Sequence, residues 1–544
     1  MAEHLLNVID LSVIFHTAKG DIRAVNKVNW HLDKGEVLAI LGESGSGKSV
    51  SASAIVDLID MPPGEVTSGK ICFRGDNLLD KTASQRREIN GKNIAVIFQD
   101  PLSHLNPVYT VGWQIEEALK VHGTDNQTAH QEMLNLLEKV GISHPHQAAD
   151  KYPHQFSGGQ RQRVMIAMAL ALRPDVLIAD EPTTALDVTV QAQILDLLVS
   201  LQKETGMGLL VITHDLGVVA EVADRVIVMQ NGEVVETGSV RDVYFNPSHA
   251  YTKQLIKAAP GKGKISSGIK PSSPLLSVLS ISKSFDGFQA LKNISFDLMA
   301  GETIAIVGES GSGKSTTAKV LLRLEAADNG QVLYQGQNIL ALSEQEMLAK
   351  RRDIQMVFQD PSQSLNPRMT VFELISEAWV IHPDILDKSE WPARVARLLE
   401  QVGLSAEHSV RYPHQFSGGQ RQRIAIARAL ALEPKIIICD EAVSALDVSV
   451  QAQVIALLKK LKKDLGLSYI FIAHDLPVVR DFADRVIVMK DGQIVETGLT
   501  KDVFANPKQI YTQDLLSASL EPDPNIQAKR RKQRKKLQQL KRQI

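Results

Sequence analysis

The chain has 544 residues, of which 44% are apolar and 22% charged, and its formal net charge is −2. That length exceeds what one hydrophobic core supports, so more than one domain is expected. No apolar run approaches the ~18–20 residues that cross a bilayer, and the first residues show no secretory signal. The two cysteines, Cys72 and Cys439, exclude a thiol-rich metal site and indicate a reducing compartment.

The first elements expected are β-strands. Residues 20–36 alternate apolar and polar side chains, which predicts part of an antiparallel sheet. The apolar strand EVLAILG (36–42) then ends in a glycine-rich turn that leads into a helix. This turn has the pattern GxxxxGKS, in which backbone N–H groups surround phosphate oxygens, Lys reaches the β- and γ-phosphates and Ser ligates Mg²⁺. The sequence therefore predicts an ATP-binding phosphate loop made of Gly42, Glu43, Ser44, Gly45, Ser46, Gly47, Lys48 and Ser49.

Farther along the chain, the apolar strand VLIAD (176–180) ends in the pair Asp180-Glu181. An Asp at the end of a strand beside a phosphate loop can hold Mg²⁺, and the next Glu can position or deprotonate the attacking water. Such a pair alone usually marks a turn, but its spacing from the phosphate loop favours catalysis. We therefore predict Asp180 as a metal ligand and Glu181 as a catalytic residue.

Most of the sequence occurs twice. The stretch KYPHQFSGGQRQR at Lys151 recurs as RYPHQFSGGQRQR at Arg411, 260 positions later. The first half has six extra residues between the phosphate loop and the next repeated motif. Strands alternating with helices in both copies predict mainly parallel sheets covered on both faces. The second copy supplies a second phosphate loop (Gly308, Glu309, Ser310, Gly311, Ser312, Gly313, Lys314, Ser315) and a second acidic pair, in which Asp440 is a metal ligand and Glu441 is catalytic.

These patterns give the expected domain limits. Residues 1–259 and 275–520 form the two repeated domains, and the Gly-, Ser-, Lys- and Pro-rich stretch 260–274 forms a flexible linker. Residues 521–544 form a basic tail, whose last sixteen residues hold nine Lys/Arg and no acid. The rest of the chain has 51 basic against 62 acidic residues, which argues against a general nucleic-acid binder.

The tail has two interpretations. It is a solvated end, or it contacts anionic lipid headgroups through a short helix. Leu537, Leu540 and Ile544 recur at i, i+3 and i+7 among basic residues, which would give such a helix one apolar face.

The stretch FSGGQ resembles the signature loop of the ATP-binding-cassette (ABC) ATPases, with Phe156 and Phe416 in place of the usual Leu. The resemblance implies an α/β fold of two P-loop NTPase cassettes, each with a mainly parallel sheet core, an antiparallel β subdomain and a helical subdomain. It also implies that the cassettes pack head to tail as an intramolecular dimer. Each ATP then lies between one cassette's phosphate loop and the other's signature residues (Ser157, Gly158, Gly159 and Gln160; Ser417, Gly418, Gly419 and Gln420).

The same resemblance assigns further residues. Gln99 and Gln359 are expected in the metal shell, and His214 and His474 are expected as catalytic switch histidines near the γ-phosphate. Phe15 and Phe285 lie where the family stacks an aromatic ring on adenine, although both positions equally suit a strand core. Asp187 and Asp447 fall in the D-loops. The second half reads Ala442-Val443 where the first has Pro182-Thr183, which leaves open whether the two sites hydrolyse ATP equally.

The wording of the motifs resembles one branch, the dipeptide and oligopeptide importer ATPases, and the fused layout resembles microcin C and glutathione importers. This implies a Mg²⁺- and ATP-dependent subunit that is peripheral on the cytoplasmic face of the inner membrane. Its partners would be two integral-membrane permeases and, indirectly, a periplasmic or extracellular solute-binding protein, with no nucleic acid. The alternative is a soluble tandem-cassette ATPase of translation or DNA repair. The short linker and the lack of zinc-binding cysteines disfavour that alternative.

The segments after each Q-loop, 102–119 and 362–379, are expected to dock the permeases. Each has helical character and carries aromatic residues, namely Trp113 in the first and Phe372 and Trp379 in the second. An ordinary core role for these rings is the alternative.

Overall fold

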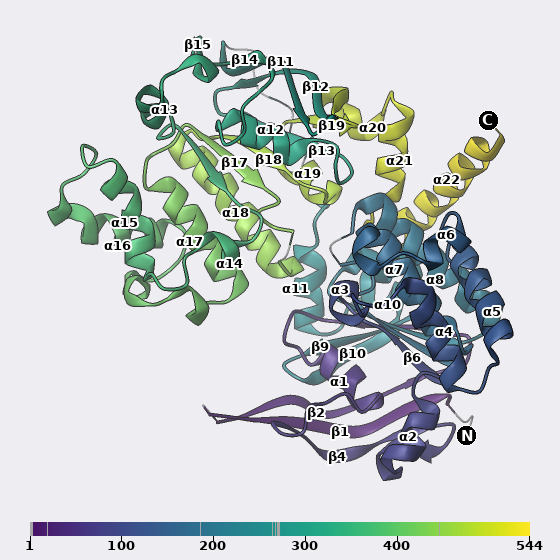
Figure 1. The fold of residues 1–544 in the computed structure, drawn as a ribbon. Helices are drawn as coiled ribbons and strands as arrows, with labels where there is room; N and C mark the ends of the chain where they lie inside the picture. Colours follow the sequence, from purple (N-terminus) through teal and green to yellow (C-terminus); the bar gives the residue numbers. More distant parts are fainter. Residues whose placement is uncertain are drawn as a thin grey trace. The chain divides into compact units, whose positions relative to one another are not determined.

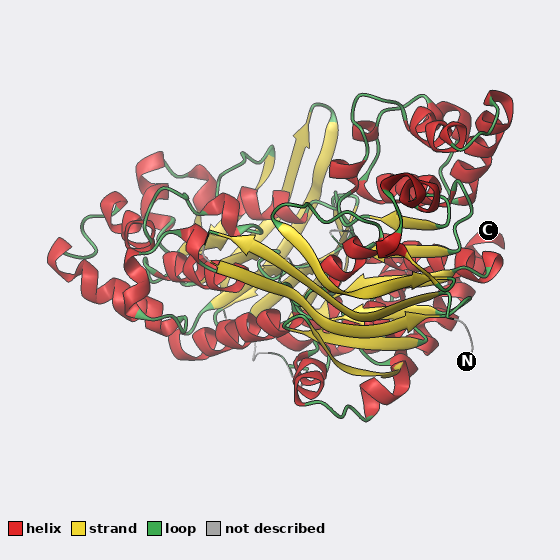
Figure 2. Cartoon of the chain, turned by 90° about the horizontal axis from the view of Figure 1, so that it is seen from below, coloured by secondary structure: helices red, strands yellow, loops and turns green. Residues whose placement is uncertain are grey.

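The protein is described here by a computed structural model that covers residues 4–543, without residues 19, 185, 264, 267, 269–272 and 445 and without the side chains of 362 and 537–543. The chain forms two compact units (Figure 1). Unit 1 comprises Met1–Ala259 with Leu520–Ile544, and unit 2 comprises Pro260–Ser519. Each unit is an α/β domain with two sheets and flanking helices, shown by type in Figure 2. The two-cassette α/β fold expected from the repeat is thus confirmed.

Unit 1 contains a four-stranded antiparallel sheet in the order β2-β1-β4-β5 and a six-stranded sheet in the order β10-β9-β3-β8-β7-β6. In the larger sheet β3 pairs in parallel with both β8 and β9, and only the edge strand β10 runs antiparallel. The strands are β1 Leu6–Thr17, β2 Gly20–Leu32, β3 Val37–Leu41, β4 Gly64–Phe73, β5 Asp76–Asn77, β6 Ile94–Ile97, β7 Val176–Asp180, β8 Gly208–Thr213, β9 Arg225–Gln230 and β10 Glu233–Ser239.

The helices of unit 1 cover the sheets and form a helical region between β6 and β7. They are α1 Lys48–Ile55, α2 Ala83–Ile89, α3 Pro101–His104, α4 Val111–Val121, α5 Asn126–Lys139, α6 Pro145–Ala149, α7 Gly158–Leu170, α8 Val188–Thr205, α9 Leu216–Val222, α10 Val240–Phe245 and α11 Ala250–Ala258. The last helix of the chain, α22 Pro524–Gln543, also belongs to this unit.

Unit 2 repeats the same topology, with sheets in the orders β12-β11-β14-β15 and β16-β17-β18-β13-β19-β20. Its strands are β11 Pro274–Phe285, β12 Phe288–Met299, β13 Thr303–Val307, β14 Asn329–Tyr334, β15 Gln337–Asn338, β16 Ile354–Val357, β17 Ile436–Asp440, β18 Ser468–Ile472, β19 Arg485–Lys490 and β20 Gln493–Leu499. Its helices are α12 Lys314–Leu321, α13 Glu344–Lys350, α14 Pro361–Ser364, α15 Val371–Ile381, α16 Trp391–Gln401, α17 Gly418–Leu430, α18 Val448–Leu465, α19 Leu476–Phe482, α20 Thr500–Ala505 and α21 Ile510–Ala518.

Apolar patterning explains this architecture. The central strands β3 and β13 are buried along their whole length, as expected for strands covered by helices on both faces. Each unit buries two apolar clusters, one around the helical region and one between the central strand and the antiparallel sheet. The extra residues of the first half lengthen β4 relative to its counterpart β14. They therefore extend the antiparallel sheet and leave the phosphate loop unchanged.

Candidate nucleotide-binding sites

The predicted site residues lie at the carboxyl edge of the large sheet in each unit. The phosphate loop follows β3, the acidic pair ends β7, and His214 follows β8. These three strands are neighbours and parallel, so their carboxyl ends meet at one edge of the sheet. Unit 2 repeats the arrangement with β13, β17 and β18. This edge is where open α/β sheets bind their ligands.

The phosphate loops turn tightly around their own lysines. The buried Nζ atom of Lys48 donates hydrogen bonds to the carbonyl oxygens of Gly42 and Glu43, both at 2.8 Å. Lys314 makes the same pair of bonds at 2.9 and 2.8 Å. Gly47 has a φ of 95°, and a Cβ atom there would lie 2.3 Å from the carbonyl oxygen of Ala24. This position therefore requires glycine, as the motif predicted.

The serine after each lysine meets the acidic residue that ends the neighbouring strand. The hydroxyl of Ser49 donates to Asp180 Oδ1 at 3.1 Å, and Ser315 donates to Asp440 at 3.0 Å. Burial raises the pKa of both aspartates, and the serine hydrogen bonds oppose that shift. Hydroxyl and carboxylate oxygens are the ligand types that Mg²⁺ prefers. The donor set therefore fits the predicted metal site.

Glu181 is the centre of the first site's hydrogen-bond network. Its carboxylate accepts from the Gln99 side-chain amide at 2.7 Å and from the Thr184 hydroxyl at 2.9 Å, and it lies 2.9 Å from Nδ1 of His214. Burial alone would raise the pKa of Glu181, but the contact with His214 lowers it overall. Conversely, burial opposes protonation of His214, while Glu181 raises the pKa of the histidine. The structure thus brings together the predicted base, Q-loop glutamine and switch histidine.

The second site has the same parts with one difference. Gln359 donates to Glu441 at 2.8 Å, and His474 Nδ1 lies 3.4 Å from the Glu441 carboxylate. Ser444, however, donates to the backbone carbonyl of Glu441, whereas its counterpart in the first site donates to the carboxylate. Among the residues that the structure describes, Glu441 therefore shows no counterpart of the hydroxyl contact that Thr184 makes with the Glu181 carboxylate.

The change from Pro182 to Ala442 does not alter the backbone of the preceding glutamate. Glu181 has a φ of 46° and Glu441 a φ of 48°. Both are in the left-handed region, which is uncommon for a residue other than glycine and often marks functional positions. The strand-to-turn geometry that presents each carboxylate is thus the same in both sites.

The signature residues cap a helix in each unit. Ser157 precedes α7 and exchanges hydrogen bonds with Gln160 in a capping box, and Ser417 does the same with Gln420 before α17. A Cβ atom on Gly159 would lie 2.3 Å from Val190, and one on Gly419 would lie 2.1 Å from Val450. The second glycine of each signature therefore serves packing.

Packing does not require glycine at the first signature glycine. A Cβ atom on Gly158 or Gly418 would meet its nearest neighbour, a leucine side chain, at 3.6 or 3.8 Å, an ordinary contact distance. Gly158 is exposed and Gly418 is partly exposed. Phe156 and Phe416, which replace the family's usual leucine, are buried anchors of the helical core.

The two candidate adenine-stacking residues differ in exposure. Phe15 is half-buried and packs against the core beside the antiparallel sheet. Phe285 is 40% exposed and lies under the ammonium group of Lys283, 4.9 Å from the ring centre. The core alternative thus has more support for Phe15 than for Phe285.

Two tyrosines that the motif analysis did not single out hold the phosphate loops. The Tyr251 hydroxyl of α11 accepts the Glu43 N–H at 3.2 Å, and the Tyr511 hydroxyl of α21 accepts the Glu309 N–H at 3.1 Å. The repeated Tyr-Thr pair at these positions is the sequence signal that would have identified them.

The predicted permease-docking aromatics fall into two groups. Trp379 is fully buried in the unit 2 core and donates its indole N–H to the Ala431 carbonyl, which supports the core alternative for this ring. Phe372 is partly buried against the same core. Trp113 is 41% exposed and stacks on Tyr109, with ring centres 3.9 Å apart. An exposed aromatic ring at this place is therefore a property of unit 1.

Two family models match the chain. The model described as ABC transporter matches residues 25–184 and 291–444, which hold both phosphate loops and both acidic pairs. The chain belongs to the ABC transporter family. A second model, described as the C-terminal region of oligopeptide/dipeptide transporters, matches residues 235–285 and 495–543 of this ABC protein.

Individual relatives match nearly the whole length of this ABC protein. The glutathione import ATP-binding protein GsiA of Salmonella paratyphi A is 48% identical and aligns with 97% of this chain and 91% of its own. GsiA of Escherichia coli K12 is 47% identical over 97% of this chain and 92% of its own. A solved dimeric structure of the ATP-binding cassette MJ0796 with ADP and Pi is 29% identical, covering 43% of this chain and 98% of that one at a TM-score of 0.40.

These findings establish an ATP-binding, ATP-hydrolysing ABC transporter subunit and set aside the translation and DNA-repair alternative. In the part of the chain that the structure describes, no helix has both the length and the apolar character needed to span a membrane.

Proposed function

We propose that this ABC subunit powers the import of peptides or peptide-like solutes, with glutathione as the first candidate. The observation that carries the proposal is a match over 97% of the chain to glutathione import ATP-binding proteins. The match to the oligopeptide/dipeptide transporter C-terminal region supports the same substrate class. The subunit would be peripheral on the cytoplasmic face of the inner membrane. It would work with two permeases and an external solute-binding protein, and without nucleic acid.

We further propose that both sites bind ATP with Mg²⁺. The residues that would hold the metal are Ser49, Asp180 and Gln99 in the first site and Ser315, Asp440 and Gln359 in the second. When bound, the metal would neutralise charge on the phosphates. Lys48 and Lys314 would exchange their loop carbonyl partners for phosphate oxygens.

The catalytic glutamates would accept the proton of the attacking water. Glu181 suits this role because its lowered pKa keeps the carboxylate ionised, and His214 and Gln99 hold that carboxylate in place. Glu441 has the same lowered pKa through His474. Glu181 and Glu441 raise the pKa of His214 and His474, and each histidine would donate a hydrogen bond near the γ-phosphate.

The two ATP sites would be composite, with the cassettes packed head to tail. The first signature glycine and the helix N-terminus behind it would offer N–H groups to the γ-phosphate of ATP held by the other cassette. The exposure of Gly158 and the partial exposure of Gly418 support this assignment.

An uptake assay tests the proposed function. Cells that depend on this chain for transport should take up labelled glutathione or short peptides. Cells that carry Glu181→Gln with Glu441→Gln should lose uptake while the protein still binds ATP, because an amide is a poor proton acceptor. Equal uptake by cells that lack the chain would contradict the proposed transport function. Robust ATP hydrolysis by the double variant would contradict the assignment of Glu181 and Glu441 as catalytic bases.

A further inference from the structure

The segment that follows each cassette in sequence belongs to the other unit. Helix α11 belongs to unit 1, but the chain from Pro260 onwards belongs to unit 2. Helix α21 belongs to unit 2, but the chain from Leu520 onwards belongs to unit 1. The two crossing points are 260 residues apart, so they are equivalent positions of the repeat.

The C-terminal helix α22 is anchored to unit 1 by a buried carboxylate, Glu221 of α9. Glu221 accepts from Arg534 at 2.7 Å and from Arg531 Nε at 2.9 Å, and the Gln527 amide also donates to it. Arg534 further pairs with Asp196 of α8 through two bonds of 3.0 Å. The three α22 residues recur at i, i+4 and i+7, and therefore share one helix face. Glu221, Arg534 and Gln527 are all at most 5% exposed.

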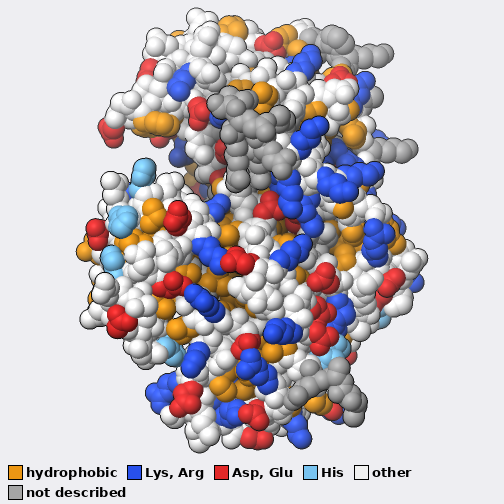
Figure 3. All heavy atoms as spheres, turned by 90° about the vertical axis from the view of Figure 1, so that its right-hand side faces the viewer, with side chains coloured by type: hydrophobic (Ala, Val, Ile, Leu, Met, Phe, Trp, Pro, Cys, Tyr) orange, Lys and Arg blue, Asp and Glu red, His pale blue; other side chains and the backbone are white. Residues whose placement is uncertain are grey.

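The opposite face of α22 is solvated. Lys529, Lys532, Lys535 and Lys536 are all exposed. Figure 3 shows one face of the molecule, on which Lys and Arg side chains lie among acidic ones. The tail thus separates basic residues that are paired and buried from basic residues that face water. The side chains of the residues predicted to contact lipid, Leu537, Leu540 and Ile544, lie outside the described part of the tail.

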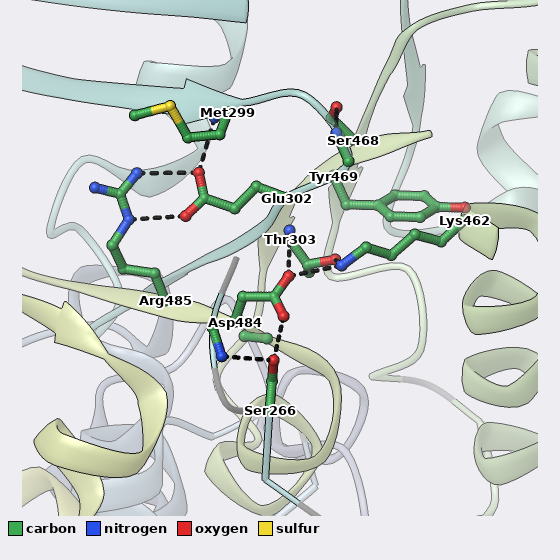
Figure 4. A network of polar contacts seen from close by, with 12 residues as sticks. Ser266, Met299, Glu302, Thr303, Lys462, Ser468, Tyr469, Asp484 and Arg485 are labelled. Atoms are coloured by element: carbon green, nitrogen blue, oxygen red, sulfur yellow. Dashed lines mark hydrogen bonds and ion pairs between the residues drawn. The ribbon is translucent and has the colours of Figure 1, made fainter. Parts of the chain in front are cut away.

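The segment after the first cassette makes the equivalent contact in unit 2. Asp481 of α19, the counterpart of Glu221, accepts the backbone N–H groups of Gly261 at 2.8 Å and Gly263 at 3.1 Å. The Ser266 hydroxyl donates to Asp484. Figure 4 shows this aspartate also accepting from the Thr303 N–H at 2.8 Å and pairing with Lys462 at 2.6 Å. Part of the predicted linker is therefore fixed to the second cassette.

Both anchors are on helices that begin directly after a switch histidine. Asp215, next to His214, is the N-cap of α9, and Asp475, next to His474, is the N-cap of α19. Leu520 packs at the start of α9, because a Cβ atom on Gly217 would lie 2.7 Å from Leu520 Cβ. The crossing segments thus contact the elements that position His214 and His474.

The other end of each crossing segment contacts a phosphate loop. Tyr251 of α11 holds the loop of Lys48, and α11 leads directly to the Asp481 anchor. Tyr511 of α21 holds the loop of Lys314, and α21 leads through Leu520 into α22, which carries the residues that contact Glu221. Each phosphate loop is therefore joined by a continuous stretch of chain to the switch-histidine helix of the other cassette.

We propose that residues 250–263 and 510–534 are reciprocal coupling segments. Each transmits nucleotide occupancy of one cassette's phosphate loop to the helix that carries the other cassette's switch histidine. The proposal rests on the ATP-binding role proposed above for Lys48 and Lys314. In this proposal the α22 face formed by Gln527, Arg531 and Arg534 binds a carboxylate of the same chain, Glu221.

Hydrogen exchange measured by mass spectrometry tests the longer segment. The experiment uses the Lys48→Ala protein, in which only the Lys314 loop should still bind an ATP analogue tightly. Calorimetry verifies that this protein binds the analogue. Adding a non-hydrolysable ATP analogue with Mg²⁺ should then slow exchange in residues 216–222 by about fivefold or more, the low end of typical coupling between sites. The comparison variant is Glu221→Gln with Arg531→Gln and Arg534→Gln, which removes both signs of charge around Glu221 and leaves only the partly exposed Asp196 without its Arg534 partner.

The triple variant should bind the analogue but lose the slowing at 216–222. The control Lys532→Gln with Lys535→Gln, on the exposed face, should keep it. Tyr511→Phe leaves the buried pairs of Glu221 intact and should also reduce the slowing of hydrogen exchange at 216–222. This variant keeps the proposal testable if the triple variant does not fold. The coupling proposal is overturned if Tyr511→Phe, or a folded triple variant, still binds the analogue and still shows the full slowing of hydrogen exchange at 216–222. Loss of analogue binding in the Lys48→Ala protein overturns the assigned second ATP site, and the coupling proposal with it.

Discussion

At the scale of single residues, the two phosphate-loop lysines are buried cations whose partners are backbone carbonyls. Lys48→Ala or Lys314→Ala removes that cation from the phosphate clamp. We expect each substitution to lower ATP turnover at its own site by about 10²–10³-fold, the usual loss when a preorganised charge-stabilising group is removed. Steady-state hydrolysis by the purified protein measures the effect. Lys34→Ala, a substitution in the β2–β3 turn, is the control, and wild-type turnover in a loop variant would refute the assignment of that site.

A second residue-scale prediction concerns His382 at the end of α15. Burial and the Arg352 guanidinium, whose Nε donates to His382 Nδ1 at 3.0 Å, lower the pKa of this histidine. The folded chain therefore resists a proton that the unfolded chain accepts near pH 6.5. The free energy of unfolding should fall as pH drops through that value and recover above it.

Thermal unfolding of unit 2 between pH 7.5 and 5.5 measures this dependence. His382→Asn keeps a hydrogen-bond acceptor but does not titrate, so its unfolding temperature should fall less over this range than that of the wild type. His122→Asn, at the equivalent but exposed position of unit 1, is the control. Parallel pH curves for the wild type and His382→Asn would exclude the histidine as the cause.

The sequence indicated which side chains would lie together, because each belongs to a short motif with its own chemistry. Ser49 contacts Asp180, and Gln99 and His214 contact Glu181, an arrangement that fits the motifs and the family resemblance. The sequence could not predict that Glu221 is a buried pairing site. An acidic residue in a helix does not indicate whether arginines more than 300 positions later will pair with it. Long-range pairing of this kind depends on how the chain crosses between units.

At the scale of elements, α4 and α15 occupy equivalent positions but present different surfaces. Periodicity placed both segments on helices, yet it could not separate the exposed Trp113 from the buried Trp379, since each falls on an amphipathic pattern. The difference arises from position on the helix. At the repeat offset of 260, Trp113 matches Glu373, whereas Trp379 matches Leu119, which is also buried. Trp379 packs beside Trp391 with ring centres 5.8 Å apart. If Trp113 of α4 contacts a permease, the buried Trp379 of α15 cannot make the same contact in unit 2.

Tyr109→Glu with Trp113→Glu tests α4 as a docking element. Both rings are partly exposed and belong to none of the ATP motifs, so the isolated subunit should hydrolyse ATP normally. Uptake of the labelled solute should fall at least about tenfold, the effect of losing about 1.4 kcal/mol of binding. Trp379→Ala is the contrasting variant, because it should destabilise unit 2 by roughly 3–5 kcal/mol. Normal uptake with two glutamates on α4 would place docking elsewhere.

At the scale of the whole molecule, the proposed sharing of ATP sites between the cassettes would give the repeat of the signature loop a functional reason. The proposed head-to-tail pairing assigns Ser417 and Gly418 to the phosphate loop of Lys48, and Ser157 and Gly158 to that of Lys314. Gly418 suits a test, because a side chain there meets its nearest neighbour at 3.8 Å and the fold tolerates it. Gly419 does not suit one, because its Cβ would collide with Val450 at 2.1 Å.

Gly418→Asp would place a carboxylate against the γ-phosphate of ATP at the Lys48 loop and weaken the N–H donation that stabilises developing phosphoryl charge. In a Lys314→Ala background, which leaves the Lys48 site as the working site, ATP turnover should fall by about 10²–10³-fold. The matched variant Gly158→Asp in the same background should change turnover little, because its signature serves the disabled site. A photoactivatable γ-phosphate probe bound at the Lys48 loop should label residues 416–420. Labelling confined to 156–160, together with inhibition by Gly158→Asp alone, would mean that each cassette completes its own site, and the shared-site proposal would fail.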